Sequence, residues 1–374
     1  MISHSLRTRL GVLIALAALL AFPLTAGVSA DNSQSANANL KHVFVIMLEN
    51  HSKSSVIGNA NAPFISSLAS TYGLAANYYG VTHPSLPNYV AAISGSNWFV
   101  NDDQPTNTFN HTNLVDQLES RGKSWAAYME TMPSVGYTGA QYPANAALYV
   151  NKHNPFVLFD DIRSNPERLS RIKPYTSFAA DMNSGRVPDF VWISPNQCHD
   201  MHGGVYTTVA GESVDGAPCP YGSAKDDPND AALKAKADAF VRTAVTTIMS
   251  SKAWTGNSAI FIVTDENDYT GNSATDGWES ADGCCDSPVL PPGYQFLNSH
   301  GNPDGHVWAG GTYGGGLIPA VVVTTHGVRN YVSQRPYNHY SLLRTIEQAW
   351  DLGYLGNASD SAQVSDMSEF FAHR

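Results

Sequence analysis

His42-Val-Phe-Val-Ile-Met-Leu48 is an unbroken apolar run, and it stops abruptly at two polar residues, Glu49 and Asn50. Such a run is typical of a strand that is covered on both faces in a parallel sheet. Similar runs occur at 259–263 and 317–323, and stretches with the apolar spacing of helices lie between them. Strands that alternate with helices predict an α/β fold with a mostly parallel sheet and helices on both faces.

Polar residues that can bind ligands follow three of the predicted strands directly. They are Glu49 and Asn50, His199 and His202, and Asp265 and Glu266. In open α/β sheets, ligands bind beyond the carboxyl ends of the strands. We therefore expect these side chains to share one edge of the sheet.

A turn followed by a helix lies at Thr82-His-Pro-Ser-Leu-Pro-Asn-Tyr-Val-Ala-Ala-Ile-Ser-Gly95. The helical apolar spacing begins at Ser85 and stops at Gly95, which predicts that Ser85 lies at or near the helix N-cap. The unpaired N–H groups and the positive dipole end at such a position can hold an oxyanion or a phosphate. A lone serine there is more often a simple cap, so its interpretation depends on the strand ends.

The strand ends offer mainly hard oxygen donors. These donors belong to Glu49, Asn50, Asp265 and Glu266. They suit Mg²⁺, Ca²⁺ or Mn²⁺ better than a thiolate-binding metal. Each acidic residue alone is better explained as a solvated strand end, but together they favour a metal site. A divalent ion beside Ser85 would lower the pKa of its hydroxyl and shield the charge of an incoming phosphoester.

Two pairs of cationic side chains could reach a phosphate. His199 and His202 could protonate a leaving oxygen or bind a phosphoryl oxygen. Hydrogen bonding to the neighbouring Asp200 explains them equally well. Lys152 and His153 form the second, weaker candidate pair.

Residues 1–30 predict a secretory signal, with Arg7 and Arg9 before an apolar run at 10–24 and cleavage near Ala30. The run is shorter than a membrane span requires, and no later segment is apolar enough to cross a bilayer. We therefore expect a secreted protein without a transmembrane segment, with one domain over 31–374. A monomer is the expected state. The formal net charge of −11 argues against nucleic acid as a partner.

Disulfides are expected, because four cysteines follow an export signal. They are Cys198, Cys219, Cys284 and Cys285. Three pairings are possible, among them a vicinal bridge and a crossed pairing that would tie two long loops together. The sequence does not decide between them.

Five motifs together resemble the phosphoesterase family of bacterial acid phosphatases and phosphatidylcholine-type phospholipases C. They lie at 42–50, 82–89, 194–202, 264–267 and 339–347. The segment Pro84-Ser-Leu-Pro-Asn-Tyr89 also resembles the nucleophile turn of nucleotide pyrophosphatases. The resemblance implies an alkaline-phosphatase-like fold. It also implies a secreted, metal-dependent phosphomonoesterase of the acid phosphatase type, with phosphatidylinositol 3-phosphate or another phospholipid head group among its possible substrates.

The resemblance also implies roles for individual residues. Ser85 would be the nucleophile and a metal ligand, with the four oxygen donors named above completing the metal site. His199, His202 and His339 would contact the phosphate or the leaving group, and Asn88 would donate to a phosphoryl oxygen. From its position alone, His339 is more simply a helix cap.

The second acidic pair departs from the family pattern. Asp265 and Glu266 stand where longer members tend to carry two aspartates, so the metal can be Mg, Ca, Mn or Zn and its number stays open. Two alternatives to the phosphomonoesterase remain. One is a phospholipase C-type phosphodiesterase, although the chain lacks the C-terminal extension of the larger phospholipases C. The other is a non-catalytic secreted cation-binding protein.

Overall fold

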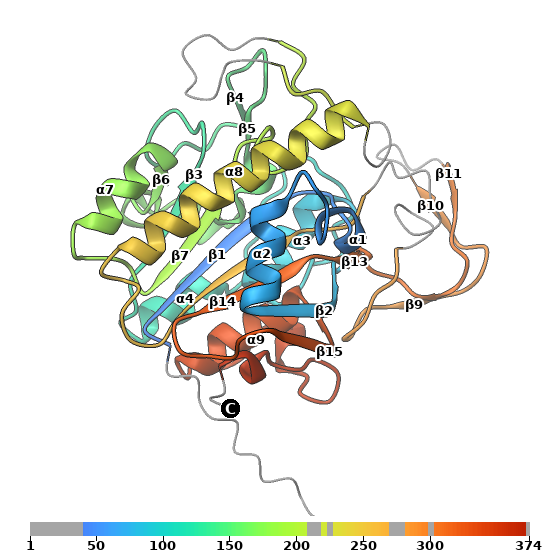
Figure 1. Ribbon diagram of the computed structural model, residues 1–374. Helices are drawn as coiled ribbons and strands as arrows, with labels where there is room; N and C mark the ends of the chain where they lie inside the picture. The colour runs from blue at the N-terminus through green and yellow to red at the C-terminus, as the bar shows by residue number, and fades with distance from the viewer. Residues whose placement is uncertain (1–39, 208–217, 223–226, 269–280, 298–302, 372–374) are drawn as a thin grey trace, which may run out of the picture. The chain divides into compact units, whose positions relative to one another are not determined.

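The computed structural model describes residues 40–207, 218–222, 227–268, 281–297 and 303–371 (Figure 1). The chain divides into two units after Gln34, and every described residue belongs to the second unit. The secretory signal predicted at 1–30 lies outside the described residues. Within the described residues, no helix has the length and apolar character that crossing a membrane requires.

A nine-stranded sheet forms the centre of the described unit, with the strand order β13-β2-β14-β8-β1-β7-β3-β6 and β15 paired with β2. The strands are β1 (His42–Leu48), β2 (Gly73–Tyr79), β3 (Trp125–Met129), β6 (Ile172–Pro174), β7 (Phe190–Ser194), β8 (Ser258–Thr264), β13 (Leu317–Ile318), β14 (Ala320–Thr324) and β15 (Tyr331–Asn338). Strand β1 pairs in parallel with β7 and β8, and β3 pairs in parallel with β7 and β6. The α/β class and the mostly parallel sheet are confirmed.

Strand β1 is buried along its whole length because helices cover both faces of the sheet. Its alternate side chains point to opposite faces. Val43, Val45 and Met47 pack in one core cluster, and Phe44 and Ile46 pack in the other.

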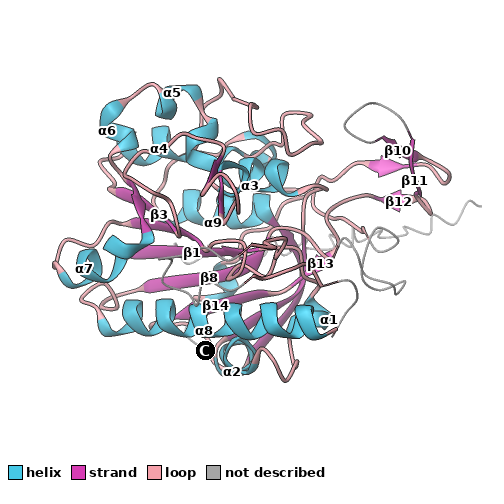
Figure 2. Ribbon diagram, turned by 90° about the horizontal axis from the view of Figure 1, so that it is seen from above, coloured by secondary structure: helices cyan, strands magenta, loops and turns pink. Residues whose placement is uncertain are grey.

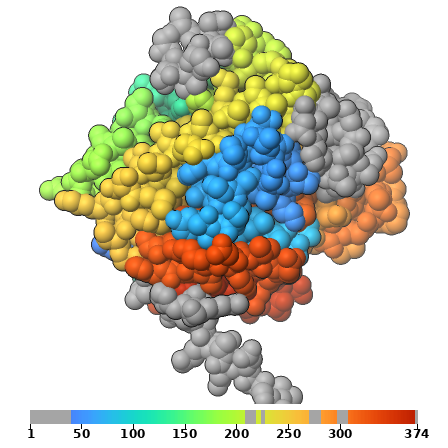
Figure 3. Space-filling view, viewed as in Figure 1, coloured from blue at the N-terminus to red at the C-terminus, as the bar shows by residue number. Residues whose placement is uncertain are grey.

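Helices α3 (Ser85–Ser94), α4 (Leu114–Ser120) and α9 (His339–Ala349) cover one face, and α2 (Pro63–Thr71) and α8 (Pro228–Ser250) cover the other (Figure 2). Figure 3 shows α2 and α8 side by side on their face. The predicted helices on both faces are confirmed.

The sequence suggested a single strand at 317–323, but this segment forms two strands. Strand β13 ends at Ile318 and β14 begins at Ala320. Pro319 lies between them, and a proline has no backbone N–H to donate to a sheet ladder. Both strands pair antiparallel to β2.

Shorter elements connect and flank these layers. The short helices are α1 (Lys53–Val56), α5 (Asp160–Arg163), α6 (Pro166–Leu169) and α7 (Phe178–Asn183), and the 3₁₀ turns are η1 (Asn151–His153), η2 (Pro155–Leu158), η3 (Tyr175–Ser177), η5 (Gly356–Ser359) and η6 (Ser368–Phe370). The small antiparallel pairs are β4 (Gln141–Tyr142) with β5 (Tyr149–Val150), β9 (Val289–Leu290) with β12 (Gly311–Thr312), and β10 (Gln295–Leu297) with β11 (Pro303–Val307).

Candidate active site

The ends of β1 and β8 meet the start of α3 at the hydroxyl of Ser85. Ser85 Oγ lies 2.9 Å from Glu49 Oε2, 3.2 Å from Glu266 Oε1 and 3.4 Å from Asn50 Oδ1. The two strands present these groups together because Leu48 pairs in register with Thr264. Glu49, Asn50 and Glu266, which the sequence placed at one edge of the sheet, therefore lie next to one another around Ser85.

Asp265 joins this cluster through the backbone of Asn50. The Asn50 N–H donates to Asp265 Oδ1 at 3.0 Å. Asn50 has a φ of 36°, in the left-handed region that asparagine enters more readily than most residues. The chain therefore bends directly after β1. The second carboxylate oxygen of Asp265, Oδ2, is buried without a hydrogen-bond partner.

Burial makes the charged forms of these carboxyl groups unfavourable. It raises the pKa of Asp265 to about 8, helped by the negative charge of Glu266. It also raises the pKa of Glu266 well above its ordinary value, and that of Glu49, with Asp265 and Asp200 as further causes. Close, desolvated carboxylates of like charge need a cation to be ionised together. The oxygen donors around Ser85 therefore fit a hard divalent metal ion.

His83 also borders this cluster. Its Nδ1 lies 2.5 Å from Glu266 Oε2. Burial lowers the pKa of His83 to about 4, against the attraction of Asp265. We expect a neutral imidazole here, which can orient the Glu266 carboxylate but cannot neutralise it.

A second set of donors lies on the other side of Glu49. Ligand atoms of Glu49, His153 and His202 all lie within 4.8 Å of one another. His153 Nε2 is 3.1 Å from Glu49 Oε1, and His153 Nδ1 is 3.3 Å from Asp200 Oδ2. A histidine whose second ring nitrogen faces a carboxylate is the usual arrangement of a metal-binding imidazole. This mixed nitrogen and oxygen set suits Zn²⁺ as well as Mn²⁺, so the number of metal ions stays open.

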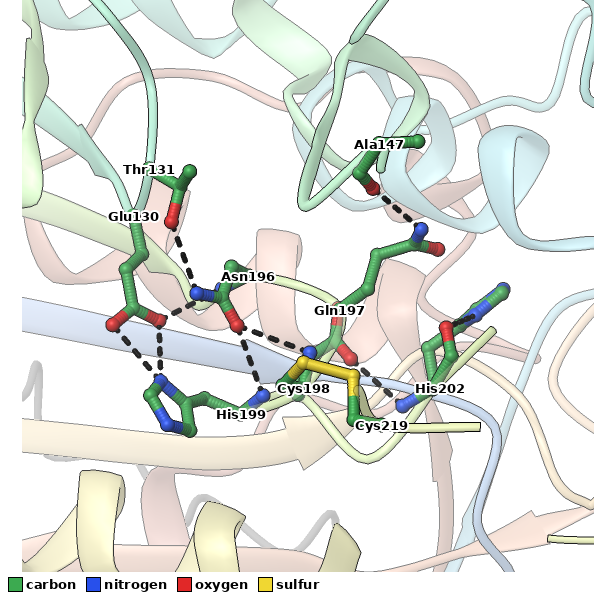
Figure 4. The surroundings of a disulfide bond; sticks show 11 residues. Glu130, Thr131, Ala147, Asn196, Gln197, Cys198, His199, His202 and Cys219 are labelled. Carbon is green, nitrogen blue, oxygen red and sulfur yellow. Dashed lines mark hydrogen bonds and ion pairs between the residues drawn. A yellow bond between two sulfur atoms is a disulfide. The ribbon is translucent and has the colours of Figure 1, made fainter. Parts of the chain in front are cut away.

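The structure separates the two histidines of the 194–202 loop. His199 Nδ1 lies 2.9 Å from both carboxylate oxygens of Glu130 (Figure 4), and its ring packs against Phe240 with 5.6 Å between the centroids. The chain reverses at Met201, which has a φ of 85°, and only His202 turns toward Glu49. Within the described residues, no hydrogen bond or ion pair connects His199 with Ser85.

Asn88 holds the turn in front of Ser85. Its Oδ1 accepts from the N–H groups of Val81 at 2.8 Å and Thr82 at 3.1 Å. Its Nδ2 donates to the carbonyls of Thr82 at 2.7 Å and Pro84 at 3.1 Å. The amide predicted to donate to a phosphoryl oxygen is thus occupied by the backbone, and it fixes the position of Ser85 instead.

His339 acts on the backbone behind Asp265. Its Nε2 lies 2.6 Å from the carbonyl oxygen of Asp265, and its Nδ1 lies 3.2 Å from Tyr78 Oη. Burial lowers the pKa of His339 to about 4, so the neutral ring donates from Nε2 and accepts at Nδ1. The cap of α9 is Asn338, whose side chain accepts from the N–H groups of Tyr340 and Ser341. His339 therefore supports the backbone at Asp265 rather than facing the Ser85 hydroxyl.

Two disulfides are present. Cys198 pairs with Cys219 (Figure 4) and Cys284 pairs with Cys285. The expected disulfides therefore form. Of the three pairings that the sequence allowed, the structure has the one with the vicinal bridge. The first bridge ties the loop of His202 to the segment 218–222.

The fold and this buried carboxylate cluster around a serine define an α/β protein with a polar site at the end of its parallel strands. A protein of the core genetic locus for glycosaminoglycan metabolism in Bacteroides thetaiotaomicron aligns over 89% of this chain and 82% of its own, with a TM-score of 0.52 and 10% identity. At that identity the likeness concerns the fold alone. A Vibrio parahaemolyticus protein in the alkaline phosphatase superfamily aligns over 84% of this chain and 67% of its own, with a TM-score of 0.47 and 10% identity.

Residues 58–216 and 220–353 match the model of the Phosphoesterase family, and the chain belongs to that family. The resemblance carried by the five motifs is thereby confirmed. A probable acid phosphatase of Kluyveromyces lactis is 35% identical over 172 residues, which are 44% of this chain and 39% of that protein. An acid phosphatase of Aspergillus fumigatus is 36% identical over 42% of this chain and 36% of its own length. The match thus spans less than half of each of these fungal relatives.

A third relative matches over most of its length. The phosphatidylinositol-3-phosphatase of Mycobacterium tuberculosis is 26% identical over 334 residues, which are 89% of this chain and 84% of that protein.

Proposed function

We propose that this chain is a secreted, metal-dependent phosphomonoesterase of the acid phosphatase type, with Ser85 as its nucleophile. Family membership and the names of the fungal relatives support hydrolysis of phosphoric esters. The mycobacterial relative supports a phosphoinositide as the substrate. Secretion follows from the charged and apolar pattern at 1–30.

One observation carries the proposal. Ser85 has a single hydroxyl proton, yet Glu49, Asn50 and Glu266 each bring an oxygen to within 3.4 Å of its Oγ. With both glutamates ionised, three acceptors around one donor are more than hydrogen bonding can satisfy. The same oxygens are the ligand set that a hard divalent cation takes up, and a serine oxygen beside such a cation is an activated nucleophile.

The chain supplies the remaining steps around Ser85. A bound metal would lower the pKa of the hydroxyl and shield the charge of the phosphoryl group. Glu49 Oε2, at 2.9 Å, is placed to accept the hydroxyl proton as Oγ attacks phosphorus. The ester oxygen leaves as the alcohol with a proton from water, because burial and the charge of Lys152 lower the pKa of His202 to about 3 and leave its ring neutral. Water then attacks the phosphoserine, the Ser85 oxygen leaves, and phosphate is released.

Replacing Ser85 by alanine tests the proposal. The Ser85→Ala variant should fold and lose hydrolysis of p-nitrophenyl phosphate. Ser94→Ala is a matched control, because Ser94 lies on the same helix and its Oγ donates to the carbonyl of Val90. Retained turnover in Ser85→Ala would remove Ser85 from the role. Hydrolysis of p-nitrophenyl phosphorylcholine in preference to the monoester would favour the phosphodiesterase alternative.

A further inference from the structure

The carboxylate of Asp103, from the loop after α3, lies against the first turn of that helix, next to Ser85. Asp103 Oδ1 accepts from the N–H of Leu86 at 2.9 Å. Helix α3 has no side-chain cap of its own, because its N-cap residue is Pro84. Asp103 therefore takes the N–H group that an anion at this helix end would use.

The other oxygen of Asp103 meets the ammonium group of the site. Asp103 Oδ2 lies 2.7 Å from Lys152 Nζ, and Lys152 Nζ lies 3.5 Å from His202 Nε2. The attraction of Asp103 and Glu49 outweighs burial and raises the pKa of Lys152, so this lysine stays charged. The carboxylate of Asp103 thus accepts from both Leu86 N–H and Lys152 Nζ. A phosphoryl group on Ser85 would bind to the same two donors.

The charge of Asp103 also reaches the cluster around Ser85. The Leu86 N–H that donates to Asp103 belongs to the residue after Ser85, whose Oγ lies 3.2 Å from Glu266 Oε1. The same charge acts on any anion that binds beside Ser85, and repulsion between like charges grows with the charge of that anion. The side chain of Asp103 is 31% exposed, so it can turn into water when an anion displaces it.

We propose that Asp103 is a specificity-determining residue that competes with the substrate phosphoryl group for Leu86 N–H and Lys152, and so favours singly charged phosphoryl groups, such as a phosphomonoester at acidic pH, over doubly charged ones. The proposal deepens the proposed function and rests on it. A competing carboxylate is a repulsive element that selects between ligands by charge. It also promotes release of inorganic phosphate, the most highly charged product.

The alternative role is purely structural, with Asp103 as a remote helix cap and as the anchor of Lys152. The two roles predict opposite results for Asp103→Asn in the full-length protein. If Asp103 competes, the inhibition constant of inorganic phosphate should fall about tenfold, with a smaller change in the inhibition constant of bis-p-nitrophenyl phosphate, a monoanionic diester. If Asp103 is only an anchor, the inhibition constant should rise or stay unchanged, which would overturn the proposal.

Asp102→Asn is the matched control. Asp102 is the neighbouring residue, and its Oδ1 accepts from Gln104 N–H and Asn107 Nδ2 rather than from α3. Its phosphate inhibition should equal that of the unmodified protein. An equal gain in affinity for phosphate and for the diester in Asp103→Asn would contradict selection by charge. Asp103→Ser provides a second variant if the asparagine protein does not fold.

A readout without turnover separates this proposal from the proposed function. The affinity for inorganic phosphate is measured by calorimetry on the unmodified and Asp103→Asn proteins, each loaded with Mn²⁺. Tighter binding by Asp103→Asn supports the competition even if no ester is hydrolysed, a result that would refute only the enzymatic proposal. Equal or weaker binding overturns the role of Asp103 even if the enzyme is active.

Discussion

Glu49 Oε1 and His153 Nε2 lie 3.1 Å apart, and neither atom makes a hydrogen bond. Both atoms are buried, so water cannot supply the missing hydrogen bonds. The second oxygen of Glu49 faces Ser85 at 2.9 Å. One carboxylate therefore belongs to two donor sets, the oxygen set around Ser85 and the mixed set with His153 and His202. This shared position makes Glu49 the residue on which both sets depend.

Replacing Glu49 by glutamine should therefore abolish metal binding by either set. The variant keeps the shape of the side chain and loses the negative charge, so we expect kcat/KM to fall roughly a hundredfold or more. Metal content after dialysis and hydrolysis of p-nitrophenyl phosphate measure the two effects. Glu347→Gln is the control, because Glu347 is also a buried carboxyl group, with its pKa raised to about 8 by burial, but it accepts from Leu355 N–H. Equal activity of the two variants would contradict the shared role.

The histidines of the 194–202 loop should differ in their effects on catalysis. His202→Gln removes a group of the site and should lower kcat roughly a hundredfold. His199→Gln should keep kcat within about tenfold, because His199 contacts Glu130 and Phe240 instead. Its cost should appear in the free energy of unfolding, about 1–3 kcal/mol for the lost partner of Glu130. Steady-state kinetics and urea unfolding measure both variants. A loss of kcat in His199→Gln as large as in His202→Gln would return His199 to the catalytic group.

The strand ends could be predicted from the sequence because an apolar run and its polar stop are local features. Glu49 and Asp265 were found in this way, and Ser85 was found from the start of a helical pattern. The role of His153 is harder to predict from the sequence. It lies in a 3₁₀ turn after the two-residue strand β5, where no periodic pattern indicates which way a side chain points. The adjacent Lys152-His153 pair was its only signal.

The orientation of His199 depended on a turn that the sequence does not specify. A helical turn would have brought His199 and His202 to the same side, but the left-handed conformation of Met201 directs them apart. Asp103 gave no signal at all, since its partners Leu86 and Lys152 are distant in the chain. Such contacts are fixed by the tertiary fold and not by local spacing.

Removing divalent cations should destabilise the folded protein as well as inactivate it. A ligand that binds only the folded state stabilises it by about 2.7 kcal/mol at a concentration one hundred times its Kd. We therefore expect the midpoint of thermal unfolding to fall in a chelator and to recover when a cation is added back. Comparing Mg²⁺, Ca²⁺, Mn²⁺ and Zn²⁺ discriminates between the donor sets, because the mixed set with His153 and His202 favours Zn²⁺. An unchanged midpoint in the chelator would contradict a metal site in this cluster.

Above about pH 6.5, where the histidines have released their protons in the unfolded state as well, the metal-free protein should lose stability as the pH rises to about 8. In the folded state the pKa of Asp265 is raised from 3.8 to about 8, chiefly by burial. Between these two values the folded state holds a proton that the unfolded state has released. The unfolding free energy then decreases with increasing pH, because the unfolded state binds fewer protons. Glu49 and Glu266 shift in the same direction.

A bound cation should reverse this trend, because metal ligands bind as deprotonated carboxylates. Urea unfolding at pH 6.5 and pH 8, in chelator and in excess Mn²⁺, measures both slopes. Asp265→Asn cannot titrate at this position, so its metal-free protein should show a shallower loss. The remaining slope comes from Glu49, Glu266, Asp200 and the distant Glu347. Metal-free protein that gained stability between pH 6.5 and pH 8 would show that these carboxyl groups are already neutralised by the chain itself, and the case for a cation at Ser85 would fail.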